Sequence, residues 1–134
     1  MKKIEHIGIA VKDLDASNEI FATLFGKQHY KIEAVESEGV KTSFFKLGPN
    51  KIELLQATSK DSPIAKFIEK KGEGVHHIAF AVSNIENEIE RLKKEGFKLI
   101  HEVPKKGADN KRIAFLHPKS TNGVLIELCE EIKH

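Results

Sequence analysis

Apolar residues recur along this chain with two different periods, and each change of period marks an expected element. Residues 4–11 are apolar and rich in β-branched side chains, which predicts a buried strand. Residues 12–26 follow with helical spacing, an aspartate cap at Asp13 or Asp15, and Gly26 where a helix commonly ends. The predicted apolar face of this helix consists of Leu14, Ile20, Phe21, Leu24 and Phe25.

Three strand-like runs follow this helix, at about residues 29–35, 40–47 and 51–57, with turn signals in "SEG" and "GPN" between them. A short connecting helix is expected in "DSPIAKFIEKKGEG", with Pro63 in its first turn. The same order then restarts with a strand at 75–82 and a helix from Ser83 or Asn84 to Gly96. Its apolar face is predicted to be Ile85, Ile89 and Leu92, and further strands are expected at about 98–102, 112–116 and 124–128.

The pattern therefore predicts an α+β fold built by duplication, in which one βαβββ module is followed by a linker and a second βαβββ module. We expect a single domain over residues 1–134, with internal modules at about 1–60 and 74–130.

The repeat extends to particular side chains. "HIGIAV" at residues 6–11 is matched by "HIAFAV" at residues 77–82, and "KIELLQ" is matched by "LIELCE" near the end of the chain. Each half therefore carries one histidine on its first strand, His6 or His77, and one glutamate on its last strand, Glu53 or Glu127. The two histidine–glutamate separations along the chain are nearly equal.

The repeated histidines and glutamates have the chemistry of a metal site. Each glutamate lies between apolar neighbours on its strand, so its side chain points to the opposite face. One such glutamate would be ordinary solvated surface, whereas two, each matched to a histidine, favour a shared site. Brought together by a pseudo-two-fold axis, two imidazoles and two carboxylates suit Zn, Co, Ni, Mn or Fe(II). His76 faces the other way in this alignment and is assigned a structural role.

Composition narrows the class of protein. The 134 residues are 40% hydrophobic and 31% charged, which is typical of one globular domain. A formal net charge of +2 is too small to favour a nucleic-acid partner. The single cysteine, Cys129, excludes an intramolecular disulfide and is predicted to be a small buried residue. No signal peptide or membrane-spanning run is recognisable, so we expect a cytoplasmic protein without a membrane partner.

Several stretches resemble a known family. "EHIGIAVKDL", "DSPIAKFIEKKGEGVHHIAFAV" and "KRIAFLHPKSTNGVLIEL" are similar to the methylmalonyl-CoA epimerase family of the vicinal oxygen chelate (glyoxalase-like) superfamily. The resemblance covers almost the whole chain and implies a curled mixed sheet around one divalent metal ion, Co, Zn, Ni or Mn. The family's metal positions fall on His6, Glu53, His77 and Glu127, and some members have glutamine in place of Glu53.

The resemblance also implies a reaction, the interconversion of (R)- and (S)-methylmalonyl-CoA by removal of the α-proton through a metal-stabilised enolate. It assigns one proton-transfer group to Glu127 and the second to Glu36 or Glu38, on either side of Ser37, where relatives often have glutamate. It further implies a small acyl-CoA thioester as partner and a homodimer. The basic candidates for binding the CoA end are Lys111, Arg112 and Lys119.

Two other functions are consistent with the same residues. Lactoylglutathione lyase (glyoxalase I) uses four similar ligands on the same scaffold and also moves a proton between carbons. A metal-free binding module of this fold is a second alternative, although the presence of all four ligand-type residues disfavours it. An extradiol dioxygenase is disfavoured by the fourth ligand, because that chemistry uses two histidines and one carboxylate.

Overall fold

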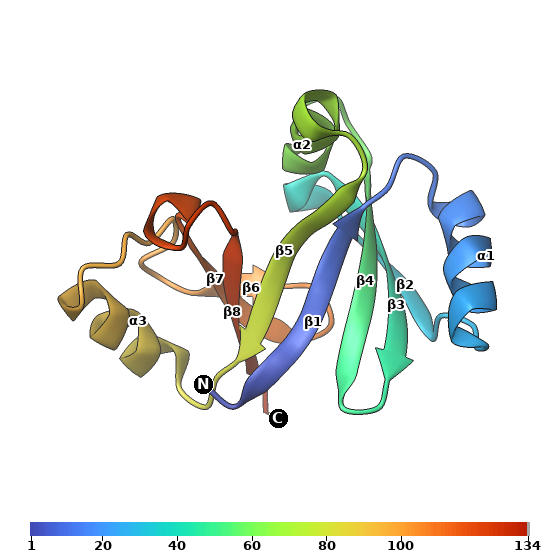
Figure 1. The fold of residues 1–134 in the computed structure, drawn as a ribbon. Coiled ribbons are helices and arrows are strands. Elements are labelled where there is room, and N and C mark those ends of the chain that lie inside the picture. The colour runs from blue at the N-terminus through green and yellow to red at the C-terminus, as the bar shows by residue number, and fades with distance from the viewer. Residues whose placement is uncertain (134) are drawn as a thin grey trace. The chain divides into compact units, whose positions relative to one another are not determined.

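The computed structural model describes residues 1–133 and has the α+β architecture that the sequence predicts (Figure 1). Its element order is βαβββ, a helix, and βαβββ, which confirms the duplicated pattern. The chain divides into two compact units, which we call the first module, residues 6–76, and the second module, residues 1–5 with the chain from His77 onward. Among residues 1–133, no helix combines the length and apolar character needed to cross a membrane.

The first module is a four-stranded mixed sheet with the strand order β2-β3-β4-β1. Strand β1 runs parallel to β4, and the other neighbours are antiparallel. Helix α1 packs against one face of these strands (Figure 1). The elements are β1 (Lys3–Ala10), α1 (Leu14–Phe25), β2 (Lys31–Val35), the 3-10 turn η1 (Glu36–Glu38), β3 (Val40–Leu47), β4 (Asn50–Ala57) and α2 (Pro63–Lys71).

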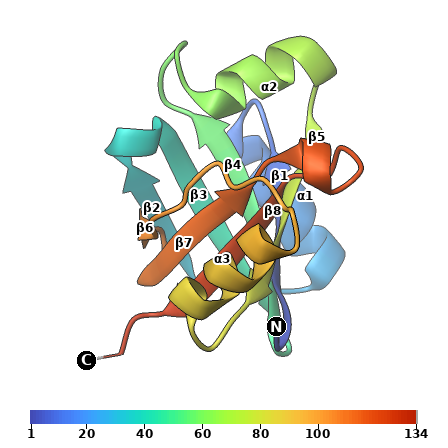
Figure 2. The ribbon, with the colours of Figure 1, turned by 90° about the vertical axis from the view of Figure 1, so that its left-hand side faces the viewer.

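The second module repeats this topology with the strand order β5-β8-β7-β6. Strand β5 runs parallel to β8, and β8-β7-β6 are antiparallel. Helix α3 covers one face of β7 and β8 (Figure 2). The elements are β5 (Gly74–Ala81), α3 (Ile85–Lys94), β6 (Lys105–Gly107), β7 (Lys111–Leu116), the 3-10 turn η2 (Pro118–Ser120) and β8 (Ile126–Glu131).

Helix α1 has the predicted ends and part of the predicted face, because Leu14 is buried and Phe21 and Phe25 pack against the core. The Asp13 side chain accepts a hydrogen bond from the backbone of the first turn, and Gly26 ends the helix with φ 71°. Ile20 and Leu24, however, are 64% and 70% exposed, so placing them in the core was wrong. Because each residue turns the helix by about 100°, they lie on the flank beside the buried stripe. The buried residues of α1 are Leu14, Ser17, Asn18 and Ala22.

In both modules, the first backbone N–H of helix α1 or α3 donates a hydrogen bond to a side chain of the last strand of the same module. The N–H of Leu14 donates to Oε1 of Gln56 at 2.6 Å, and the N–H of Ile85 donates to Oε1 of Glu130 at 2.8 Å. Gln56 and Glu130 are the final residues of the matched stretches "KIELLQ" and "LIELCE". The two contacts are equivalent, so they set Leu14 of the first module in correspondence with Ile85 of the second.

The substitution Gln56→Ala is expected to lower the free energy of unfolding by about 1 kcal/mol, because it removes an acceptor from a helix N-terminus. Urea denaturation followed by circular dichroism measures this change. Glu69→Ala, on the exposed side of α2, is the control and should stay within about 0.5 kcal/mol of the unmodified protein. Equal stability of the two variants would contradict the capping role.

The strand expected at about residues 98–102 is wrong. That segment makes only an isolated bridge between Leu99 and Leu116, and the strand beside β7 is β6, further along the chain. Here a side chain takes the place of a backbone carbonyl in the strand pairing, because Nδ1 of His101 accepts the hydrogen bond of the Phe115 N–H at 3.2 Å. The carbonyl of Phe115 in turn receives the N–H groups of both Ile100 and His101. Such a junction interrupts the regular strand pairing.

Candidate active site

The first module holds His6 and Glu53 together. Their strands, β1 and β4, are parallel neighbours in which Gly8 is the register partner of Glu53. Nδ1 of His6 lies 3.1 Å from Oε2 of Glu53. Both residues are buried, with exposures of 3% and 6%, so the glutamate is not solvated surface.

The second module holds His77 and Glu127 in the same way. Strands β5 and β8 are parallel neighbours in which Ala79 is the register partner of Glu127. Nε2 of His77 lies 2.9 Å from Oε1 of Glu127, and both side chains are buried. In each module the histidine therefore precedes the glutamate's register partner by two residues. The duplication has preserved the relative placement of the two side chains as well as their identity.

A phenylalanine lies beside each glutamate, and neither phenylalanine was predicted from the sequence to belong to the site. In the antiparallel pairs on the other side, Phe44 is the register partner of Glu53, and Phe115 is the partner of Glu127. The ring of Phe115 meets the imidazole of His77 edge to face at a centroid distance of 5.7 Å. Each carboxylate is thus bordered by an aromatic ring, which limits its contact with water.

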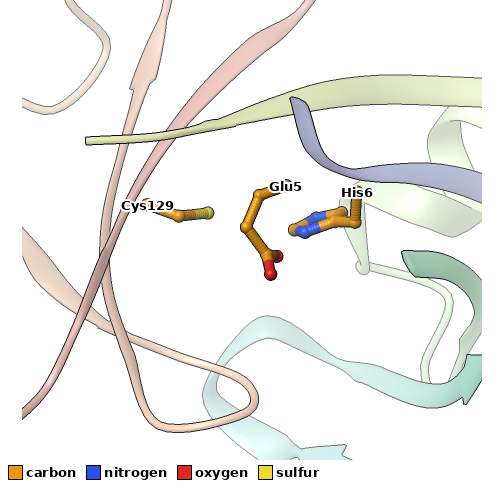
Figure 3. Close-up of side chains that lie close together, drawn as sticks. All are labelled: Glu5, His6 and Cys129. Atoms are coloured by element: carbon orange, nitrogen blue, oxygen red, sulfur yellow. The ribbon is translucent and has the colours of Figure 1, made fainter. Parts of the chain in front are cut away.

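The second oxygen of Glu127 also has a partner. Sγ of Cys129 lies 3.4 Å from Oε2 of Glu127, and the cysteine is buried as predicted. Glu5, from the same module, is 6% exposed, and one of its carboxylate oxygens lies within 4.8 Å of the Cys129 sulfur. Figure 3 shows the thiol turned toward the Glu5 side chain. Sequence reasoning missed Glu5 because a charged residue beside Lys2 and Lys3 has the pattern of solvated surface.

The two candidates for the second proton-transfer group lie in η1. Glu36 is exposed, whereas Glu38 is partly buried. The turn ends at Gly39, which has φ 62° and whose carbonyl accepts the N–H of Thr58 at 2.8 Å. A Cβ at Gly39 would come within 3.1 Å of Ser62 and would occupy a left-handed backbone conformation. The glycine therefore fixes η1 against the connection between β4 and α2.

The three basic candidates have different surroundings. Arg112 binds Glu86 of α3 and also Glu130 at 3.2 Å. The side-chain hydrogen bond between Arg112 and Glu86 raises the pKa of Arg112 and lowers the pKa of Glu86. Strand alternation places Lys111 on the opposite face, which it shares with Phe115, and its Nζ donates to a turn carbonyl. Lys119 is exposed in η2.

His76 makes a packing contact away from its neighbour His77. Its ring meets Phe67 of α2 edge to face, at a centroid distance of 4.9 Å. This is the structural role expected from strand alternation.

Comparison with known proteins agrees with the resemblance that the sequence indicates. The model of the Glyoxalase/Bleomycin resistance protein/Dioxygenase superfamily matches residues 5–115. The mitochondrial methylmalonyl-CoA epimerase of Homo sapiens is 39% identical over 127 residues, which cover 94% of this chain and 72% of that protein. The ethylmalonyl-CoA/methylmalonyl-CoA epimerase of Cereibacter sphaeroides is 38% identical over 128 residues, which cover 94% and 96%.

A solved structure supports the same relationship. A variant of the Streptomyces coelicolor methylmalonyl-CoA epimerase, in complex with 2-nitronate-propionyl-CoA, superposes with a TM-score of 0.94. It is 36% identical, and the match covers 98% of this chain and 95% of that one. The similarity thus extends over both modules.

Proposed function

Because the chain belongs to the Glyoxalase/Bleomycin resistance protein/Dioxygenase superfamily, we propose that it is a metal-dependent epimerase that interconverts (R)- and (S)-methylmalonyl-CoA. The observation that carries the proposal is the buried histidine–glutamate pair, which recurs with the same register in both modules of a chain similar to epimerases. The relatives described above are epimerases and not lactoylglutathione lyases, so the glyoxalase alternative is not carried further.

We propose that His6, Glu53, His77 and Glu127 together hold one divalent metal ion. The donor chemistry fits, because each module supplies one imidazole nitrogen and one carboxylate, both buried and within 3.1 Å of each other. Two carboxylates would also balance the charge of the ion in a buried place. When bound, the ion would polarise the thioester oxygen of the substrate and make the proton at C2 more acidic.

In this proposal Glu127 takes the C2 proton. The C–H bond breaks, its electron pair moves toward the thioester carbonyl, and the carboxylate of Glu127 receives the proton. The contacts of its two oxygens with His77 and Cys129 hold the carboxylate in one orientation. Return of a proton to the opposite face of the planar carbon inverts C2, so a second group is needed there.

We propose Glu38 as this second group, because it is partly buried while Glu36 is exposed. Glu38→Gln should lower the rate of inversion at C2 by about 10²–10⁴-fold, the usual contribution of a general acid or base. Glu36→Gln is the matched control from the same turn and should leave the rate close to that of the unmodified protein. A large loss of rate in Glu36→Gln with little loss in Glu38→Gln would transfer the role to Glu36. Small losses in both variants would exclude η1 from proton transfer.

For the CoA end we propose Lys111 and Lys119 as anion-binding groups, with Arg112 chiefly joining α3 to the sheet. Lys111 shares a face of the second module's sheet with the partner ring of Glu127, which supports its choice. The homodimer expected from the resemblance is tested by sedimentation of the intact chain.

The experiment that tests the function is exchange of the C2 proton of methylmalonyl-CoA for deuterium in D₂O. We expect exchange by the metal-loaded protein, loss of exchange after chelation, and recovery after a divalent ion is returned. Metal analysis of the purified protein identifies the ion. Methylglyoxal with glutathione serves as the parallel substrate, and formation of lactoylglutathione without C2 exchange would replace the proposal with the lyase.

A further inference from the structure

Phe115 lies between two histidines of the second module. Its ring meets the imidazole of His77 at a centroid distance of 5.7 Å and the imidazole of His101 at 5.8 Å. His77 belongs to the proposed metal site, whereas His101 has no part in the function proposed above. Because Phe115 is the register partner of Glu127, its ring and that carboxylate share one face of the sheet. The residue that fixes Phe115 therefore also acts on the surroundings of Glu127.

The backbone of Phe115 is held at its outer edge by His101 and the residue before it. The ladder between β6 and β7 reaches Ile113, two residues short of Phe115. Beyond that point, Nδ1 of His101 accepts the N–H of Phe115 at 3.2 Å. The Phe115 carbonyl accepts the N–H groups of Ile100 and His101 at 2.8 and 3.3 Å. His101 thus contacts Phe115 through its ring, its Nδ1 atom and its own backbone.

The first module identifies the residue that corresponds to His101. Phe44 holds the equivalent place in that module, beside its glutamate. The carbonyl of Phe44 accepts the N–H of Tyr30 at 2.8 Å, which is the bond that Ile100 makes in the second module. Because Lys31 follows Tyr30 as His101 follows Ile100, Lys31 corresponds to His101.

The two modules hold their phenylalanines in different ways. Lys31 is the ladder partner of Phe44 in the pairing of β2 with β3, and its Nζ lies 4.9 Å from the centre of the Phe44 ring. A regular strand therefore fixes the backbone of Phe44, independently of the Lys31 side chain. In the described part of the second module, the corresponding segment makes only an isolated bridge to β7. The N–H of Phe115 thus depends on a single side chain, that of His101.

A displacement of Phe115 would reach both oxygens of Glu127. Oε1 of Glu127 lies 2.9 Å from Nε2 of His77, whose ring Phe115 contacts. Oε2 lies 3.4 Å from Sγ of Cys129, and Phe115 packs against the buried cluster to which Cys129 belongs. Without the Nδ1 acceptor, the Phe115 N–H would have to seek water or another partner, which moves this edge of β7.

We propose that His101 is a positioning residue for Glu127 and acts through Phe115. By accepting the Phe115 N–H, it holds the aromatic ring against His77 and keeps the carboxylate of Glu127 in the orientation that receives the C2 proton. The inference rests on the proposed function and adds to it a residue outside the proposed metal site.

The test compares His101→Asn with His101→Leu, two side chains of nearly the same shape. Asparagine keeps an acceptor near the position of Nδ1, and leucine does not. At saturating metal, we expect His101→Leu to lower kcat for inversion at C2 by about 10–100-fold, the usual effect of a residue that orients a site from outside it. KM should change little, because substrate binding is not altered. His101→Asn should restore most of the rate.

Lys31→Ala is the matched control, because it removes the corresponding side chain from the first module, where β2 fixes the phenylalanine. It should leave kcat close to that of the unmodified protein. Equal rates in His101→Leu and His101→Asn, or an effect of His101→Leu on KM alone, would overturn the proposal. His101→Ala removes the same acceptor without adding bulk and replaces His101→Leu should that variant fold poorly.

A second measurement tests the contact without the reaction. Amide hydrogen exchange of the Phe115 N–H is followed by NMR on protein free of metal and substrate. We expect protection to be retained in His101→Asn and lost in His101→Leu, together with a shift of the His77 ring protons in the leucine variant. Equal protection in the two variants would refute the positioning role. Failure of the unmodified chain to invert C2 would refute only the epimerase proposal, because this measurement needs no acyl-CoA.

Discussion

Glu127→Gln is expected to lower the rate of inversion at C2 by about 10²–10⁴-fold, because an amide cannot receive the proton that the carboxylate takes. The substitution keeps the length of the side chain, and an amide oxygen can still face His77, which lies 2.9 Å from the carboxylate. The loss should therefore appear in kcat more than in KM, since a group that acts in the transition state is removed.

The matched control for this experiment is Glu53→Gln. Glu53 has the same register, the same histidine geometry and the same burial in the first module, but the proposal gives it only a ligand role. The resemblance to epimerases with glutamine at this position predicts that activity survives. Metal content measured for both variants separates lost binding from lost chemistry. Equal losses of inversion at equal metal content would contradict the assignment of proton transfer to Glu127.

Phe45→Ala is expected to have the largest effect on stability, about 3–5 kcal/mol, the usual cost of truncating a buried aromatic residue. Phe45 is fully buried and contacts the rings of Phe25 and His29, so its loss leaves a cavity under α1. Urea denaturation monitored by circular dichroism gives the change in the free energy of unfolding.

Leu24→Ala is the informative control for Phe45→Ala. Apolar periodicity placed Leu24 in the core, whereas the structure leaves it 70% exposed. Its truncation should change stability by no more than about 0.5 kcal/mol. A cost similar to that of Phe45→Ala would mean that the α1 flank is covered in solution.

The duplicated fold could be predicted from sequence because two independent signals agreed. Alternation and helical spacing predicted the order of elements, and matched stretches such as "IEL" predicted which positions of the modules correspond. The pairing of His6 with Glu53 and of His77 with Glu127 followed from the same repeat, and the distances in each module confirm it. A repeat constrains a site strongly because every inference is made twice.

Several misses have a common physical cause, since each depends on where the folded chain places residues that are distant in sequence. His101 interrupts the predicted strand by accepting the N–H of Phe115, which no local pattern reveals. Glu5 and Asn18 are polar residues in ordinary surface or helix contexts, and only the folded chain shows that they are buried. No pattern in the sequence indicates that Arg112 forms an ion pair with Glu86.

The division of the chain into modules does not follow the division of the sequence into halves. Met1–Glu5 belongs with the second module, where the N–H of Lys2 donates to the carbonyl of Ala81 at 2.8 Å, and Gly74–His76 belongs with the first. A gene cut between His76 and His77 would therefore leave the first module whole but would separate the second module from Met1–Glu5. The first module can thus be expressed as one continuous stretch, whereas a chain that starts at His77 would need Met1–Glu5 joined to it to complete the second module.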